Sequence, residues 1–242
     1  MQASISKPVK SEKEWTNVKP GLEYKNINVE NRDFTIIEID PQKYYFEVFE
    51  NQIAPDNKTI SEVHKEQGSL LSFNGIFFTE KYEPTGLLIS NGKKLHKLSK
   101  ASLVNGIFTI DDQNQVKILR TNEFENSKNY IFALQNGPLL IYKDKIEIDT
   151  DSQKTASRTT IGVNNENKII IIILRQSIFN FGNTLSLYDF AHMVKGNSAF
   201  KDLNISNLLN LDGGNSTGFA INDEYYPEIE KVQNIILTKE RL

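Results

Sequence analysis

The chain has 242 residues, of which 38% are hydrophobic and 24% charged, and its formal net charge at pH 7 is −3. This is the composition of an ordinary globular protein, and the small acidic excess argues against a general nucleic-acid binder, which needs clustered Lys and Arg. The sequence has no cysteine, which excludes disulfides, thiol catalysis and Cys-based metal centres, and no run approaches the roughly 18 apolar residues of a membrane span.

The first 29 residues are polar, contain two prolines and show little periodicity, which predicts a lead-in that is partly disordered. They lack the apolar core of a signal peptide, so the sequence fits either a cytosolic protein or an exported one without its signal. Strand signals begin at residues 33–39 and 44–50, which are rich in β-branched and aromatic residues. Thr59 and Glu62 then form a capping-box pattern with a stop at Gly68, which predicts a helix over residues 60–67.

Strand-like runs follow, separated by turn signals such as Asn91-Gly92 and by a break at Asn136-Gly137-Pro138. Residues 158–175 predict a hairpin whose second strand is apolar on both faces and therefore central and buried. A further helix is expected over residues 185–196. Many strands, few helices and no regular βαβ alternation indicate an α+β fold: a strand-rich mixed or antiparallel sheet with a few packed helices. We expect residues 30–242 to form a single domain.

The most informative segment is LLNLDGGNSTGF, in which a buried strand ends at Asp212. The strand places a carboxylate at a sheet edge, and Gly213 and Gly214 let backbone N–H groups approach a ligand without an intervening Cβ. Three short polar residues that can bond hydroxyls or phosphate oxygens follow: Asn215, Ser216 and Thr217. The structural alternative is a tight turn in which Asp212 caps its own backbone.

Three other positions are candidates for a site. Asn74 lies inside an apolar strand, where a polar side chain needs a partner, although a bulge or a hairpin turn explains it equally well. Asn136 and Gly137 precede a proline at a strand end, where a turn is the alternative. Arg158 opens a strand in a chain with five arginines, and its guanidinium suits bidentate recognition of phosphate or carboxylate unless it is an ordinary surface arginine.

Two kinds of cofactor site have no support in the sequence. There is no Gly-rich nucleotide loop of either common type. The three histidines are not at metal-ligand spacing, and the Asp212 segment lacks the alternating acids of a calcium loop. We therefore predict no cofactor, and a divalent cation has no ligand motif to support it.

Taken together and in order, these segments resemble the phosphodiester glycosidase family, whose best-known animal member is the uncovering enzyme and whose bacterial members are often labelled exopolysaccharide-related. The matching pieces cover about residues 61–220: SEVHKEQGSLLSFNGIFF, EPTGLLISNGK, VNGIFTI, LQNGPLLIYKDKI, SRTTIGV, LSLYDFAHMV and LNLDGGNST. Two residues depart from the family pattern. Ile76 replaces a small residue after Asn-Gly, and Asn215 replaces the more usual glycine after Asp-Gly-Gly.

The resemblance implies a hydrolase that cleaves the anomeric bond between a sugar and a phosphodiester during glycan or envelope-polymer processing. A phosphodiester is a good leaving group, so the transition state mainly needs charge stabilisation at both ends. We expect Asp212 to stabilise the oxocarbenium-like carbon or steer water. We expect Arg158, together with the N–H groups of Gly213 and Gly214, to hold the departing phosphate. We expect Asn74 and Asn136 to bind sugar hydroxyls or phosphate oxygens.

The remaining expected substrate contacts are Gly137, Asn215, Ser216 and Thr217, and the expected partner is a carbohydrate phosphodiester rather than nucleic acid. The family also implies a secreted or extracytoplasmic bacterial protein. The competing hypothesis is a non-catalytic glycan-binding or envelope-polymer-binding protein on the same scaffold, which Asn215 and the shortage of proton-transfer groups favour. A phosphodiesterase that cuts the P–O bond usually needs two metals, for which no His/Asp cluster is visible.

Overall fold

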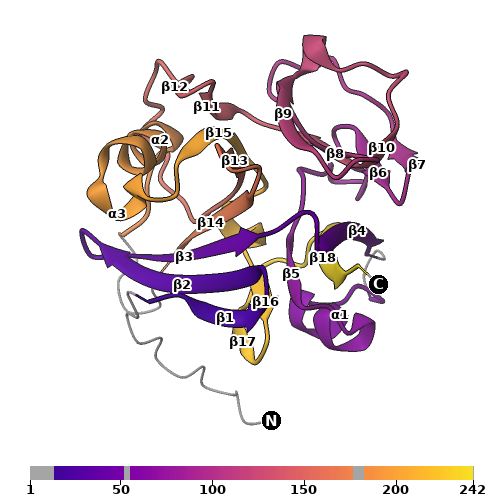
Figure 1. Ribbon diagram of the computed structural model, residues 1–242, viewed down its shortest axis with the longest axis horizontal. Helices are drawn as coiled ribbons and strands as arrows, with labels where there is room; N and C mark the ends of the chain where they lie inside the picture. The colour runs from indigo at the N-terminus through magenta and orange to yellow at the C-terminus, as the bar shows by residue number, and fades with distance from the viewer. Residues whose placement is uncertain (1–13, 52–54, 177–182, 242) are drawn as a thin grey trace.

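The computed structural model describes residues 14–51, 55–176 and 183–241. In these residues the chain forms three antiparallel sheets and three α-helices, which confirms the strand-rich α+β class. Figure 1 shows α2 and α3 on one side of the largest sheet and the two smaller sheets on the other. The helices are α1 (Ile60–Gln67), α2 (Leu187–Gly196) and α3 (Ser198–Lys201).

The largest sheet has eight strands, and each smaller sheet has five. The eight-stranded order is β1 (Thr16–Lys19), β2 (Leu22–Val29), β3 (Arg32–Ile39), β14 (Ile169–Arg175), β13 (Arg158–Asn164), β15 (Ile205–Asn210), β11 (Leu139–Tyr142) and β12 (Lys145–Ile146). The second sheet runs β7 (Lys93–His96), β6 (Leu88–Ser90), β10 (Tyr130–Asn136), β8 (Gly106–Asp111) and β9 (Val116–Arg120). The third runs β17 (Glu224–Tyr226), β16 (Phe219–Ile221), β5 (Leu71–Asn74), β18 (Asn234–Glu240) and β4 (Tyr44–Glu50).

The β13–β14 hairpin lies at the centre of the large sheet, as predicted. Every residue of β14 is buried, because successive side chains point to opposite faces and both faces are covered. Ile169, Ile171 and Ile173 enter the main core, which contains residues of all three sheets. Ile170 and Ile172 enter a second core with α2 and α3. The unbroken apolar run is therefore the signature of a strand between two hydrophobic layers.

The predicted irregular lead-in is wrong for the part of it that contains β1 and β2, since both strands belong to the large sheet. Leu22 and Tyr24 are buried on one face of β2, but the next inward residue is Asn26, which accepts a hydrogen bond from the Thr35 hydroxyl at 2.7 Å. This buried polar residue hides the two-residue period of the strand. Residues 1–13 lie outside the described residues, and the single domain over residues 30–242 stays a prediction.

The local signals read from the sequence are confirmed where they are strongest. Helix α1 begins with the Thr59–Glu62 capping box and ends at Gly68, whose φ is +55°. Helix α2 buries Phe190 and Ala191 against the sheet. Residues Asn91-Gly92 turn β6 into β7 with positive φ at both positions.

Candidate functional site

The Asp212 loop lies where the large sheet meets the third sheet. Asp212 follows β15, and its N–H donates to the carbonyl oxygen of Gly75, which follows β5 (3.1 Å). A short 3-10 turn, Gly214–Ser216, then leads into β16 of the third sheet. The carboxylate is thus delivered by a central strand of one sheet and anchored to the end of a strand in another.

Asn74 supports this loop from beneath. It is fully buried, its Nδ2 donates to the Asp212 carbonyl oxygen at 2.7 Å, and its Oδ1 accepts from the Thr159 hydroxyl at 2.7 Å and the Gly218 N–H at 3.3 Å. The amide therefore joins the two sheets and has no surface to offer a ligand. The structure thus shows Asn74 bonded within the protein, where the sequence predicted a contact with sugar or phosphate oxygens.

Asn136 has the same kind of position between the second sheet and the large one. It is fully buried, accepts from the Phe77 N–H at 3.0 Å and donates to the Asn210 carbonyl oxygen at 3.0 Å. A Cβ on the adjacent Gly137 would lie 2.1 Å from the carbonyl oxygen of Leu103, so this glycine is required for close backbone packing. The predicted ligand contacts of Asn136 and Gly137 are accordingly replaced by structural contacts.

Asn234, which the sequence did not single out, completes this buried set. Its Oδ1 accepts from the Ile76 N–H at 2.7 Å, and a Cβ on Gly75 would come within 1.9 Å of the same oxygen. The Asn74-Gly75 pair is therefore explained by packing: the asparagine bonds the Asp212 loop and the glycine makes room for Asn234. A lone asparagine in a C-terminal strand carries no local signal that could have revealed this.

The Asp212 side chain is partly buried and held by two donors. Its Oδ1 accepts from the Gly213 N–H at 2.9 Å, and its carboxylate accepts from the buried Ser216 hydroxyl. Burial raises the pKa of Asp212 to about 6, against the opposing effect of these two hydrogen bonds, and the negative charge of Glu230 raises it further. The carboxyl is therefore held in a fixed orientation, with a pKa above that of an ordinary aspartate.

The two glycines after Asp212 close the loop against the start of β13. The Gly213 N–H bonds Asp212, and the Gly214 N–H donates to the Ser157 carbonyl oxygen at 2.9 Å. A Cβ on Gly213 would lie 2.9 Å from that same oxygen, and Gly214 has a φ of +61°. Both N–H groups are thus engaged within the protein, so the predicted phosphate cradle of glycine N–H groups is not formed in this structure. The bond from the Gly213 N–H to Asp212 is the self-capped turn that the sequence offered as the alternative.

Arg158 places a positive charge beside this loop. Its Nε donates to the Leu185 carbonyl oxygen at 3.1 Å and its Nη2 to the Lys154 carbonyl oxygen at 2.6 Å, and no Asp or Glu of the described residues pairs with it. A Cβ on Gly213 would lie 4.0 Å from Arg158 Cδ, which shows how closely the side chain passes the loop. Burial lowers the pKa of Arg158 to about 10, so the group stays cationic at neutral pH.

A second carboxylate, which the sequence did not reveal, is tied to the loop. The exposed Asn215 donates from Nδ2 to Glu230 Oε1 at 2.9 Å, and its carbonyl oxygen accepts from the N–H groups of Ile229 at 2.8 Å and Glu230 at 3.0 Å. Glu230 lies in an irregular segment without any motif. Only the fold brings it to Asp212, through the residue that departs from the family pattern.

Thr217 differs from its neighbours because its hydroxyl is buried without a hydrogen-bond partner among the described residues. Of the predicted loop residues, Ser216 therefore orients Asp212, Asn215 holds Glu230, and Thr217 has unused bonding capacity. Three cavities of the described residues, one of them between α1 and β17, are lined by other residues. The described residues contain no group of three or more His, Asp or Glu placed to hold a metal ion, and no helix among them is long and apolar enough to cross a membrane.

Most of the chain is similar to known proteins. Residues 67–239 match the family model described as phosphodiester glycosidase. An uncharacterized protein of Escherichia coli (strain K12), YigE, is 28% identical over 186 residues, which cover 72% of this chain and 68% of that protein.

Three solved structures share the fold. A hypothetical protein from Synechocystis has a TM-score of 0.70 at 16% identity over 98% of this chain, which spans 64% of that protein's length. The catalytic domain of zebrafish N-acetylglucosamine-1-phosphodiester alpha-N-acetylglucosaminidase, auto-inhibited by its pro-peptide, has a TM-score of 0.68 at 19% identity over 92% of this chain and 85% of that one. A putative exported protein from Burkholderia pseudomallei has a TM-score of 0.61 at 10% identity over 86% and 74% of the two chains.

Proposed function

Because the chain belongs to the phosphodiester glycosidase family, we propose that it hydrolyses the bond between the anomeric carbon of a sugar and a phosphodiester oxygen. The products are a free reducing sugar and a phosphomonoester. The observation that carries the proposal is a loop in which the partly buried Asp212 carboxyl is held by the Gly213 N–H and the Ser216 hydroxyl, next to the cation Arg158, whose Cδ would lie 4.0 Å from a Cβ on Gly213.

Arg158 is proposed to stabilise the departing phosphate. Two of its guanidinium nitrogens are fixed by carbonyl oxygens, while Nη1 forms no hydrogen bond with another described residue. A cation held in this way needs no reorganisation when negative charge develops on the departing phosphate, which is the condition for strong electrostatic stabilisation. The partly buried position strengthens the attraction relative to that of an exposed arginine.

Asp212 is proposed to act at the sugar. In its ionised form it stabilises positive charge on the anomeric carbon or takes a proton from the attacking water. The Ser216 and Gly213 hydrogen bonds fix the direction in which the carboxylate faces. Glu230 supplies a second negative charge close to the same loop, so we assign it to the carboxylate pair of the reaction.

The other loop residues are proposed to complete the substrate site in separate ways. Asn74, Asn136 and Gly137 hold the loop in place from the interior. The residues proposed to line the substrate are Gly213, Gly214, Asn215 and Thr217.

The substrate we propose is a sugar phosphodiester of a glycan or envelope polymer. One protein with the same fold is named for action on an N-acetylglucosamine-1-phosphodiester, which makes that sugar the first to test. Another is described as a putative exported protein, and we propose an extracytoplasmic location for this chain as well. Mapping the mature N-terminus of natively expressed protein tests the location: a processed N-terminus supports export, and an unprocessed cytosolic chain contradicts it.

The function is tested with a panel of sugar-1-phosphodiesters that includes glycerol-linked N-acetylglucosamine phosphate. Free reducing sugar and phosphomonoester are quantified together, for the natural chain and for Asp212→Asn. Equal amounts of both products, lost in the variant, are expected. Sugar phosphate with free alcohol would instead indicate cleavage of the distal P–O bond. Ligand-induced thermal stabilisation without any product would favour the non-catalytic binding protein.

A further inference from the structure

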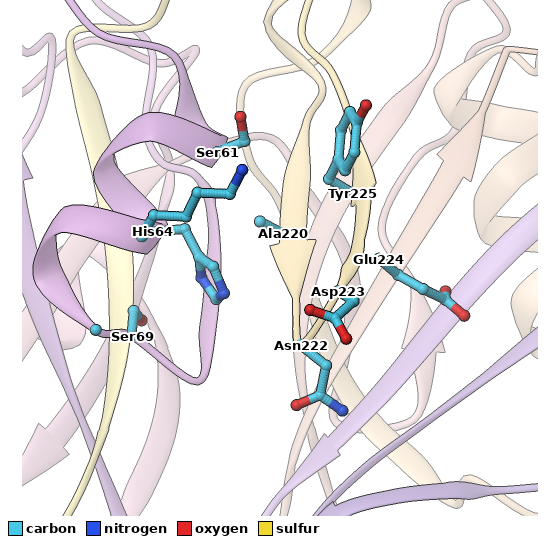
Figure 2. A pocket seen from close by; sticks show the side chains of 10 residues that line it. Ser61, His64, Ser69, Ala220, Asn222, Asp223, Glu224 and Tyr225 are labelled. Carbon is cyan, nitrogen blue, oxygen red and sulfur yellow. The ribbon is translucent and has the colours of Figure 1, made fainter. Parts of the chain in front are cut away.

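A cavity lies at the other end of β16 from the Asp212 loop. It has a volume of about 350 Å³ and opens between α1 and the β16–β17 hairpin. Figure 2 shows Ser61 and His64 on the α1 side, Asp223 and Tyr225 on the hairpin side, and Ala220 between them. From Thr217 to Asn222 an extended chain spans roughly 17 Å, so this α1–β17 cavity is separate from the Asp212 site.

The two walls of the α1–β17 cavity are held together from inside. His64 is buried, its Nδ1 lies 3.0 Å from the Ser72 hydroxyl, and its ring also hydrogen-bonds the backbone of Asn222 at the hairpin turn. β5 and β16 pair directly beside it, with Leu71 opposite Ile221. The cavity is therefore formed before any ligand arrives, which reduces the ordering cost of binding.

The polar side chains that line the cavity fall into two groups: those of His64, Ser69 and Glu224 are hydrogen-bonded within the protein, and four others are not. Those of Ser61, Lys65, Asp223 and Tyr225 form no hydrogen bond or ion pair with another described residue. Tyr225 keeps 39% of its surface exposed. Its ring forms one flank of the cavity (Figure 2), so an apolar face stands next to free donors and acceptors.

This combination matches a neutral sugar ring. Sugar hydroxyls both donate and accept, which suits an ammonium, two hydroxyls and a carboxylate placed around one space, while the C–H face of a pyranose packs on an aromatic ring. The lining holds one ammonium, that of Lys65, and the carboxylate of Asp223, while the Glu224 carboxylate accepts a hydrogen bond from Asn26, so the cavity has no excess of positive charge to select phosphate. The volume lies at the lower end of the ~300–1,000 Å³ range of small-molecule sites and has room for a single ring.

We propose that the α1–β17 cavity is a second carbohydrate-binding site, which holds a neutral sugar unit of the glycan whose phosphodiester is cut at the Asp212 loop. The proposal rests on the proposed function for the identity of that glycan, but the binding itself does not require catalysis. It places the substrate among glycans long enough to offer a sugar away from the cleaved bond.

The test is amide-resolved NMR titration of the full chain with N-acetylglucosamine and methyl α-glucopyranoside, with glycerol and inorganic phosphate as controls. The two sugars are expected to shift the amides of α1 and of residues 222–225 in both the natural chain and Asp212→Asn. Tyr225→Ala is expected to weaken binding about tenfold, and Tyr225→Phe, which keeps the ring, about twofold. Tyr188→Ala, a change on α2 far from the cavity in sequence, serves as the matched control and leaves binding unchanged.

Three results would overturn the proposal: no shifts with either sugar, shifts of equal size with glycerol or phosphate, or shifts confined to the Asp212 loop. The last of these would leave the proposed function intact. Conversely, sugar binding at the cavity by a protein that releases no sugar from any phosphodiester would contradict the proposed function while supporting the second site. The two ideas therefore fail separately.

Discussion

The polar groups around the Asp212 loop divide into two sets. In one set the hydrogen-bonding groups are all used within the protein, and in the other the charges have no ion-pair partner. The buried asparagines Asn74 and Asn136 bond the protein with both their donor and acceptor groups, and neither has exposed surface. The charged groups Asp212, Arg158 and Glu230 form no ion pair with one another or with other described residues. The same sequence motifs thus contain both buried asparagines that hold the loop and charged groups that are not neutralised by an ion pair. Only the structure distinguishes the two sets.

Asp212→Asn should have the largest effect on activity. It keeps the size of the side chain and can still be held by Ser216, but it removes the negative charge and the proton acceptor. We expect the turnover number to fall on the order of 10²–10³. Steady-state kinetics checks this, with thermal unfolding as proof of folding. Turnover near that of the natural chain in a folded variant would show that the charged set is not the catalytic one.

Arg158→Met should follow, with a loss of about 10² in kcat/KM for a phosphodiester, because the cation that meets the phosphate is gone. Arg158→Lys is the matched variant: it retains charge but loses the fork that holds Leu185 and Lys154 carbonyl oxygens, so we expect partial recovery. If the Arg158→Met and Arg158→Lys variants lost the same kcat/KM, the role of Arg158 would be structural rather than electrostatic.

Asn74→Ala should mainly affect stability, with the free energy of unfolding falling by about 2–3 kcal/mol, because the Thr159 hydroxyl and the Asp212 carbonyl oxygen lose their partner in the interior. Chemical denaturation measures this against Asn126→Ala, an exposed asparagine that should change little. If Asn74→Ala were as stable as the natural chain but lost turnover, Asn74 would have to be grouped with the residues that take part in the reaction.

The pH dependence of stability gives a smaller test of Asp212. Its pKa is about 6 in the folded protein, above the ordinary 3.8, so the group favours folding below about pH 4 and this contribution is lost as pH rises to 6. Across that window the natural chain should lose at most about 3 kcal/mol relative to Asp212→Asn, less where solvent screens the charge. Denaturation of both proteins at pH 4 and pH 7 measures the difference, and parallel curves would contradict the raised pKa.

Glu230→Gln should have the smallest effect. Removing its charge lowers the pKa of Asp212, so the acid limb of the activity profile should move to lower pH by a fraction of a unit. Asn215→Gly, which frees Glu230 from its hydrogen bond, is the companion variant. A profile that does not move would show that Glu230 does not influence Asp212 during the reaction.

The same division explains what could be predicted from the sequence. The β13–β14 hairpin, α1 and the Asn91-Gly92 turn follow local rules, and the structure confirms them. Strand β2 was not predicted because Asn26 interrupts its alternation of apolar residues. Its turn to β3 also has positive φ angles without a glycine to signal them.

At the site, the sequence identified the loop but not the direction of each side chain. Arg158 passes close to Gly213, the residue after Asp212, whereas Asn74 and Asn136 turn inward to backbone groups from distant segments. Glu230 is recruited through Asn215, a contact that no local pattern encodes. Hydrogen bonds between segments far apart in the chain are set by the packing of the three sheets, which a single sequence does not display.

The central claim, cleavage at the anomeric carbon, is tested most directly by hydrolysis of glycerol-linked N-acetylglucosamine phosphate in ¹⁸O-labelled water. Cleavage of the sugar-side C–O bond and of the sugar-side P–O bond yields the same two products, and only the position of the label distinguishes them. With Asp212 and Arg158 acting as proposed, the label enters the C1 hydroxyl of the released sugar and the phosphomonoester stays unlabelled. Label in the phosphomonoester would mean that water attacks phosphorus and would contradict the account.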